Sequence, residues 1–382
     1  MSNRRVRLAD IAELTVGYVG NMAKQYKETG VKFLRSLNIK PFHIVEDDLK
    51  YISKEFSESL SKSILHENDL IIVRTGMPGT CCVVPKEYEN CNCADVVIVR
   101  PNLKKVNPHY LAAYINVWGK KQVENNKVGA IQKHFNVKSA EEMVIDLPDL
   151  EQQYKVAKVL TDLNGKIFIN EKINDYLCDQ IQLLFSYFFN LSSVPETWSK
   201  GVLSDIADIT MGQSPSGNSY NIIGKGCPFY QGSTDFGAIF PAIRMYTNKP
   251  SRYALALDTL LSVRAPVGSL NIAFENCCIG RGLASIHGKN DNNIFVRYLI
   301  KNNRWYFDNI NNSGTTFGSI TKDYLFGMPI TIPEDKLVAM FEHKSSLIEQ
   351  QIYANEQQIR ELQSLRNWLL PVLMNGQATI ID

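Results

Sequence analysis

The chain repeats one sequence pattern twice, and this duplication restricts its possible folds more than any other feature. Residues 8–12 (LADIA) return as residues 203–207 (LSDIA), 195 positions later. Residues 69–74 (DLIIVR) return as residues 258–264 (DTLLSVR). From Gly129 onward the offset stays at 185 residues. A chain duplicated in this way should fold as two copies of one architecture.

The two copies diverge in their front halves, where residues 13–68 and 208–257 differ in length and share almost no sequence. A common scaffold with different inserts indicates two related domains with different binding tasks. Around the inserts, β-branched runs punctuated by Gly and Pro are typical of strands, and short helices should follow Pro108 and Asn293. The predicted strands lie at 69–73, 81–84 and 96–99, and at 259–264, 270–274 and 283–286.

The rear of each repeat predicts one long helix, because apolar residues recur there in alternating steps of three and four. These residues are Leu160, Leu163, Ile167, Leu177, Ile181, Leu184 and Phe188, and then Ile348, Ile352, Ile359, Leu362, Leu369 and Leu373. Such a seam fits a helix that packs on its own domain, or an antiparallel coiled coil of the two helices. Its recurrence at a constant offset favours the coiled coil. Pro371 should stop or kink the second helix.

Asn170 and Asn355 interrupt the two seams at equivalent positions. A buried asparagine costs stability but fixes the register of a coiled coil when two of them pair. In an antiparallel pair these two side chains could meet near the middle. Alternatively, both face solvent because the seam drifts around the helix.

The predicted fold class is therefore α+β, with two pseudo-repeated domains joined by two long helices that form an antiparallel coiled coil. We expect the first domain at 1–148, the first helix at 149–194, the second domain at 195–332 and the second helix at 333–382. Helices of about 35 residues, at a rise of about 1.5 Å per residue, would be near 50 Å long.

The net charge of +2 is unevenly distributed among these segments. The first domain holds 21 Lys and Arg against 17 Asp and Glu, the second holds 12 against 9, and the two helical segments are net negative. Surface variation alone could give such excesses, but the pattern also suits phosphate contact by the domains and protein contact by the helices. Without a signal-like or membrane-length apolar run, we expect a cytoplasmic protein that does not contact a membrane.

Motifs for catalysis and metal binding are weak. The string NPHY at 107–110 is close to the [ND]PP[YF] signature of adenine methyltransferases, but it lacks the second proline and precedes a helix, where Pro is common. No phosphate-binding G-x-x-x-x-G-K-[ST] loop is present. Four of the eight cysteines lie at 81, 82, 91 and 93 without the paired C-x2-4-C spacing of zinc sites. We therefore expect a non-catalytic chain with reduced thiols and no metal.

The divergent inserts hold polar residues suited to nucleic acid. Gln, Asn and Arg can form paired hydrogen bonds with base edges, while Ser, Thr and Lys commonly contact phosphates. The candidates are Lys24, Tyr26, Lys27, Arg35 and Asn38 in the first insert, and Gln213, Ser214, Ser216, Tyr220, Gln231, Ser233, Thr234 and Arg244 in the second.

Ordered motifs along the chain carry a family resemblance. Residues 194–198 (VPETW), followed by residues 203–206, resemble the P-E-x-W…L-x-D-I opening of a target-recognition domain. Residues 149–153 with Asn170-Glu171, and residues 369–377, resemble the family's conserved helices. Residues 129–134 and 313–316 resemble its turn before the last strand of each domain. Together the chain resembles the DNA specificity subunits of type I restriction-modification systems. Residues 3–8 lack a clear P-E-x-W opening, which leaves the first domain's start open.

The resemblance implies partners and cofactors. Each domain would read half of a bipartite double-stranded DNA site in host defence, and the helices would set the spacing and bind two methylation subunits through Leu163, Ile167, Asn170, Leu177, Leu184, Ile348, Ile352, Asn355, Leu362 and Leu369. S-adenosylmethionine would be held by the methylation subunits, and ATP and Mg²⁺ by motor-nuclease subunits. A protein adaptor on the same scaffold, or a subunit of a methylation-only system, remains an alternative. If the helices measure the DNA, matched heptads inserted after Ile167 and after Ile352 should lengthen the unread gap.

Overall fold

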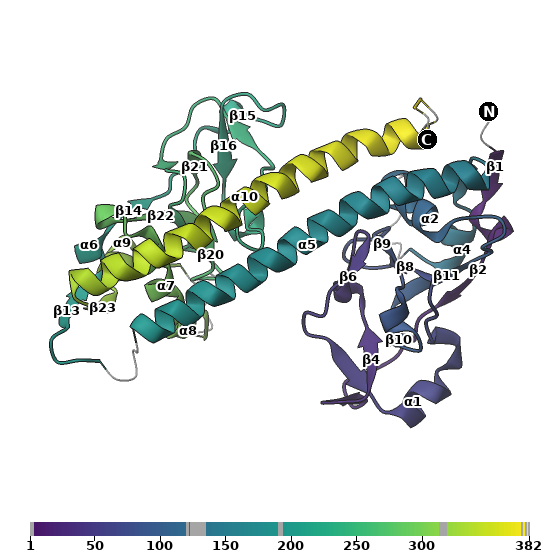
Figure 1. Cartoon of the computed structure of the whole chain (residues 1–382), viewed down its shortest axis with the longest axis horizontal. Coiled ribbons are helices and arrows are strands. Elements are labelled where there is room, and N and C mark those ends of the chain that lie inside the picture. The colour runs from purple at the N-terminus through teal and green to yellow at the C-terminus, as the bar shows by residue number, and fades with distance from the viewer. Residues whose placement is uncertain are drawn as a thin grey trace. The chain divides into compact units, whose positions relative to one another are not determined.

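The computed structural model describes residues 4–119, 122, 135–189, 194–312, 319–375, 377–378 and 380. The chain divides into two compact units (Figure 1). The first comprises residues 1–170 and 358–382, and the second comprises residues 171–357. Each unit therefore contains one mixed domain and one half of each long helix. The repeat strings at 129–134 and 313–316 lie outside the described residues.

The first unit contains two four-stranded sheets and a strand pair. One sheet has the order β2-β11-β8-β9, formed by Ala12–Val16, Val96–Pro101, Leu70–Val73 and Cys81–Val83. The other has the order β10-β4-β7-β3, formed by Asn92–Cys93, Val31–Leu34, Lys50–Ile52 and Tyr26–Lys27. β1 (Arg4–Arg7) pairs antiparallel with β12 (Val144–Leu147), and β5 (Ile39–Lys40) pairs with β6 (His43–Ile44). The short helices are α1 (Lys54–Ser59), α2 (Pro108–Tyr114) and α4 (Val137–Glu141).

The second unit repeats this plan. Its first sheet has the order β14-β22-β19-β20, formed by Ala207–Met211, Leu283–Gly288, Thr259–Ser262 and Leu270–Ile272. Its second has the order β15-β17-β16-β21-β18, formed by Tyr220–Asn221, Tyr246–Thr247, Cys227–Tyr230, Cys277–Ile279 and Tyr253–Ala254. β13 (Ser199–Val202) pairs with β23 (Pro329–Ile332), and the short helices are α6 (Leu203–Ile206), α7 (Asn293–Asn302), α8 (Trp305–Asn312) and α9 (Lys322–Phe326). The predicted duplication is confirmed at the level of strand order.

Burial explains why the central strands are so apolar. Every residue of β8 and of β19 is buried, as expected for strands covered on both faces. In the second unit, Phe185 of the first long helix, Phe189 directly after that helix and Phe341 of the second long helix pack with ring centroids 5.1–5.7 Å apart. This aromatic cluster joins the two helices to the domain core of the same unit.

The two long helices are α5 (Leu150–Phe188, 39 residues) and α10 (Asp335–Met374, 40 residues). They begin at equivalent repeat positions, 185 residues apart. Along α10 the buried side chains at 338, 341, 345, 349, 352, 355 and 359 follow steps of three and four, as a coiled-coil seam requires. The helices pack together in each unit, which confirms the predicted antiparallel pair (Figure 1). Pro371 lies inside α10, three residues before its end.

The two seam asparagines are buried but do not pair with each other, so both sequence readings of them were wrong. Asn170 is 6% exposed and donates to Gln358 at 2.6 Å. Asn355 is 8% exposed and donates to Asn174 at 2.9 Å. Repeat symmetry suggested that Asn170 and Asn355 face each other. Instead, Asn174, about one helical turn after Asn170, lies opposite Asn355.

Among the described residues, no helix is both long enough and apolar enough to cross a membrane.

Candidate nucleic-acid interface

Three loops meet at the end of the sheets in the second unit. They are residues 212–216 after β14, 231–235 after β16, and 280–282 between β21 and β22. Backbone hydrogen bonds tie them together: Gly212 N–H donates to Leu283 O, Gly280 N–H to Tyr230 O, and Gly282 N–H to Gln231 O, at 2.8–3.2 Å. Together these loops form what we call the loop cluster of the second unit.

Glycine permits this close approach of backbones. A Cβ at Gly212 would lie 2.1 Å from Gly280 O, and one at Gly282 would lie 2.5 Å from Gln231 O. Both distances are far below contact, so any side chain at these two positions would force the loops apart.

Asp235 organises the middle loop. Its side chain is 6% exposed and accepts hydrogen bonds from Gln231 N–H at 2.7 Å and from Arg244 Nε–H at 2.8 Å. Arg244 also donates to Thr234 Oγ1 at 3.0 Å, and its side chain is 57% exposed. The buried carboxylate therefore fixes both the loop backbone and the direction of an exposed guanidinium.

The loop cluster presents groups that can read bases. Gln213, Gln231, Thr234 and Arg244 are exposed, while Ser214 and Ser233 are half-buried. Arg281, which the sequence did not single out, is exposed beside them, and its N–H donates to Ser214 Oγ at 3.4 Å. Glutamine and arginine side chains form paired hydrogen bonds with adenine and guanine edges.

Two other candidates of the second insert support the first loop. Tyr220 is half-buried, stacks on Phe229 with centroids 5.0 Å apart, and donates to Pro215 O at 2.8 Å. Ser216 is exposed and donates to Asn218 Oδ1 at 2.6 Å. Tyr220 thus shapes the loop through packing, whereas Ser216 lies at its surface.

The first insert places its candidates on and beside β3 and β4. Lys24 and Lys27 are exposed, and the half-buried Tyr26 ring lies under the Arg35 guanidinium at 5.9 Å. Arg35 also binds Asp48 at 2.9 Å, and hydrogen bonds from Lys50 and Arg35 lower the pKa of the Asp48 carboxyl.

The prediction for Asn38 needs correction. Its side chain is fully buried, its amide donates to Val45 O and Asp47 O, and its oxygen accepts from Arg35 N–H. Asn38 therefore holds the turn after β4 and presents no free edge to a base.

A loop cluster also occurs in the first unit at the equivalent place. Tyr18 N–H donates to Cys93 O, and Ala94 N–H donates to Leu34 O, so the segments after β2, β4 and β10 are again tied together. Asp95 is the acidic centre of this cluster and accepts from Arg74 and Thr75, each at 3.0 Å. The two repeats thus build the same site with different side chains.

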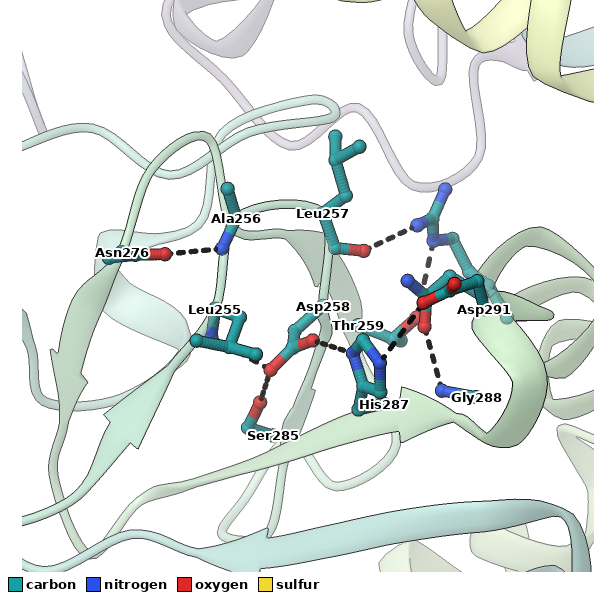
Figure 2. A network of polar contacts seen from close by, with 12 residues as sticks. Leu255, Ala256, Leu257, Asp258, Thr259, Asn276, Ser285, His287, Gly288 and Asp291 are labelled. Atoms are coloured by element: carbon teal, nitrogen blue, oxygen red, sulfur yellow. Dashed lines mark hydrogen bonds and ion pairs between the residues drawn. The ribbon is translucent and has the colours of Figure 1, made fainter.

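A second polar network lies inside the second unit (Figure 2). The buried Asp258 carboxylate accepts from Ser285 Oγ and from Leu255 N–H, and lies 2.7 Å from His287 Nδ1. At the equivalent positions of the first unit, Asp69 faces Arg100 at 3.6 Å. This network joins β19 and β22 at the end of the sheet opposite the loop cluster, and its Asp258 and Ser285 are buried.

Comparison with protein families decides what this duplicated scaffold is. The model of the type I restriction modification DNA specificity domain matches residues 3–177 and again residues 195–361. The chain belongs to this family. The two matches coincide with the two repeats found in the sequence, so each repeat carries one specificity domain.

Relatives agree with this assignment. The chain is 28% identical over 372 residues to the putative type I restriction enzyme MjaX specificity subunit of Methanocaldococcus jannaschii, covering 92% of this chain and 83% of the relative. It is 26% identical over 137 residues to the type I restriction enzyme EcoBI specificity subunit of Escherichia coli, covering 35% and 28% of the two chains. The crystal structure of the type I restriction-modification S subunit from M. genitalium shares the fold at a TM-score of 0.54 and 13% identity, covering 98% and 99%.

The methyltransferase-like string of this specificity chain has a structural role. Asn107 caps α2: its side chain accepts from the N–H groups of His109 and Tyr110, and Pro108 occupies the first helical turn. The described residues include no cluster of three or more His, Cys, Asp or Glu side chains arranged for a metal. Burial raises the pKa of Cys91 to about 11, so this thiol stays protonated and inert.

Proposed function

We propose that each unit of this specificity subunit reads one half of a bipartite double-stranded DNA site through its loop cluster. The observation that carries the proposal is the convergence of exposed Gln213, Gln231, Arg244 and Arg281 on one cluster held by backbone hydrogen bonds. Rigid presentation matters because a side chain that is already oriented loses little entropy when it meets a base. The excess of positive charge in both domains would add the salt-dependent attraction to phosphates.

Methylation-motif sequencing tests the reading role of the second unit. In a complex with its methylation partner, the Gln231→Ala and Arg281→Ala variants should relax one half of the motif, with each lost base contact costing about 1–3 kcal/mol. The other half should stay intact. Lys322→Ala is the control, because Lys322 is exposed on α9, outside the loop cluster. Relaxation of both halves, or an unchanged motif, would contradict the proposal.

The first insert is tested by exchange. Arg281→Ala should affect one half of the methylation motif. Replacing residues 13–68 with those of a relative should alter the other half and leave the first half unchanged. A change in both halves would show that the two units do not read independently.

We further propose that the outer face of α5 binds a methylation subunit. Ile173, Tyr176, Leu183 and Tyr187 are 39%, 68%, 70% and 83% exposed. Their steps of three, seven and four place them on one face of the helix. An exposed apolar stripe of this kind is typical of a protein interface, and Tyr is enriched at the centre of such contacts.

Binding of the purified methylation subunit tests the stripe. The double variant Tyr176→Glu and Tyr187→Glu should weaken binding at least tenfold, because it places charges in an apolar contact. Two single variants, which each add one charge, make the matched comparison: Tyr187→Glu should weaken binding, and Ser186→Glu, at the exposed neighbouring position, should leave binding unchanged. Equal effects of both variants would place the partner elsewhere.

The chemistry would reside in the partners. S-adenosylmethionine would be held by the methylation subunits, and ATP and Mg²⁺ by motor-nuclease subunits. The purified chain should therefore transfer no methyl group to DNA. Methyl incorporation that disappears in Asn107→Ala would instead make this chain a methyltransferase.

A further inference from the structure

The loop cluster of the first unit presents apolar side chains to solvent. Val19, Leu37 and Met77 are 64%, 45% and 58% exposed. They come from three separate segments, which follow β2, follow β4 and join β8 to β9. The loop cluster of the second unit instead presents glutamine and arginine side chains, so the two repeats offer different chemistry at the same place in the fold.

Asp95 draws the three segments together. Its N–H donates to Tyr18 O and its carbonyl accepts from Ser36 Oγ, both at 3.2 Å. Its carboxylate accepts from Thr75 Oγ1 at 3.0 Å. Each of these three contacts is made one or two residues before one of the exposed apolar side chains. The apolar side chains therefore belong to one surface region that is centred on Asp95.

Val19 occupies the backbone position of Ser214 in the second unit. Residues 17 and 212 donate their N–H groups to the first residues of β11 and β22, each at 2.9 Å. Residues 18 and 213 donate to the last residues of β10 and β21, at 2.8 and 3.0 Å. Because these hydrogen bonds match, an exposed valine stands in the first unit where the second has a half-buried serine.

Leu37 corresponds to Thr234 in the same way. Each is the middle residue of a three-residue 3₁₀ turn, Ser36–Asn38 after β4 and Ser233–Asp235 after β16. In both turns the last residue is buried and the middle residue is exposed. The same turn thus presents a hydroxyl in one repeat and an aliphatic side chain in the other.

The apolar side chains stand on turns with a fixed backbone. Gly20 lies against the Tyr18 ring, since a Cβ there would come 2.4 Å from the hydroxyl oxygen, and that ring packs edge-on against Phe56 at 5.8 Å. Met77 lies in a turn that Gly79 N–H closes onto the end of β8 at 3.1 Å. A surface held in this way loses little entropy when it meets a ligand.

Aliphatic side chains can recognise one base edge in the major groove. Thymine alone among the four unmodified bases carries an apolar group there, its C5-methyl, whereas the other groups are hydrogen-bond donors and acceptors. We infer that Val19, Leu37 and Met77 read thymine through this methyl group in the half-site of the first unit. The inference rests on the proposed function, because it requires that the loop cluster meets the major groove.

Deoxyuridine lacks only the methyl group of thymidine, so it tests the contact. The complex with its methylation partner is titrated with a fluorescent duplex of its own motif. Two further duplexes carry deoxyuridine in place of thymidine, one in the half-site of the first unit and one, as a control, in the unread gap. The half-site substitution should raise the Kd about fourfold for each contacted methyl group, and the gap substitution should leave it unchanged. Equal Kd values for all three duplexes would overturn the inference.

Near-isosteric polar variants assign the contact to these residues. The triple variant Val19→Thr, Leu37→Asn and Met77→Gln should bind the thymidine and deoxyuridine duplexes equally, with an unchanged unfolding midpoint because the three side chains are exposed. Leu103→Asn is the matched control: Leu103 is also exposed, but it lies between β11 and α2, outside the loop cluster, and this variant should keep the preference for thymidine. A preference that persists in the triple variant would place the methyl contact elsewhere and overturn the inference.

The exchange of residues 13–68 separates this inference from the proposed function, and it also identifies the half-site of the first unit. If the exchange leaves the methylation motif unchanged, the first unit does not read DNA through its insert and the proposed function fails. If the exchange alters one half-site but deoxyuridine in that half-site binds as well as thymidine, the reading role stands and the thymine contact alone is wrong.

Discussion

Asp69 and Asp258 occupy equivalent positions of the two repeats, but each faces a different side-chain partner. Both carboxylates are buried, at 4% exposure each, and each caps the turn before a central strand by accepting a backbone N–H, from His66 and Leu255 respectively. In the first unit the partner is Arg100, and in the second it is His287. Because the two partners lie at equivalent strand positions, the scaffold accepts either side chain.

This equivalence predicts the outcome of substitution in the second unit. His287→Arg should change the free energy of unfolding by less than about 1 kcal/mol, whereas Asp258→Ala should cost about 2–4 kcal/mol, because Ser285 and Leu255 lose a buried acceptor. Urea unfolding of the full chain measures both. If His287→Arg were as damaging as Asp258→Ala, the two repeats would not share this pairing.

Glu342 predicts a pH dependence of stability. Burial, helped by the nearby Glu349, raises the pKa of Glu342 to about 7, against hydrogen bonding from Phe295 N–H and the attraction of Arg297. The folded chain therefore retains a proton that the unfolded chain releases near pH 4.3. Between these two values folding takes up a proton, so this group's contribution to stability falls as pH rises.

The Glu342→Gln variant should remove that fall while keeping an acceptor for Phe295. Its unfolding free energy should exceed that of the wild type at about pH 8 by at most about 3 kcal/mol, and the difference should shrink toward about pH 5. Urea titrations at the two pH values check this. A pH-independent difference between the chains would assign the effect to packing.

At the scale of elements, the sequence was sufficient to predict the helices and strands that depend on local spacing or that occur in both repeats. The helices were predictable because the heptad spacing of their apolar residues lies within one continuous stretch of sequence. The strands β12 and β23 begin 185 residues apart, the same offset that the sequence repeat shows. Arg281 was missed because its neighbour Ser214 is 67 residues away and only the fold joins them. Aligning the repeats could have pointed to it, since Ala94 and Asp95 occupy the same connection between strands.

The asparagines between the helices predict a non-additive effect. Asn355 donates to Asn174, and Asn174 in turn donates to Ile352 O at 3.3 Å. Asn174→Leu alone should cost about 1–3 kcal/mol, because the Asn355 amide is left unpaired among apolar neighbours. Adding Asn355→Leu should recover most of that loss, because a wholly apolar seam has no unpaired group. A double-mutant cycle by urea unfolding gives the coupling, and additive losses would contradict the pairing.

At the scale of the whole molecule, both helices pass from one unit into the other, α5 after Asn170 and α10 after Gln357. Insertions after Ile167 and Ile352, which repeat symmetry suggested, do not lie opposite each other in an antiparallel pair. Hydrogen bonds join Asn170 to Gln358 and Asn355 to Asn174. In this register the numbers of two facing residues, one from each helix, add up to about 528. Matched insertions therefore belong after Asn170 and after Gln357, where each unit keeps all its own pairs.

Such insertions test whether the helices measure the DNA. One heptad in both helices preserves the seam and adds about 10 Å, or about three base pairs, but three base pairs also turn the duplex by roughly a third of a turn. Three matched heptads add about 31 Å, close to the roughly 34 Å of one DNA turn, so both units would face the same side of the duplex again. Motif sequencing should then show the two half-sites unchanged and the unread gap longer by about nine base pairs. Three heptads in α5 alone should abolish methylation, because the pairs of one unit are lost. If the complex with three heptads in both helices methylates DNA and the unread gap between the half-sites is unchanged, the helices do not set the distance between the half-sites.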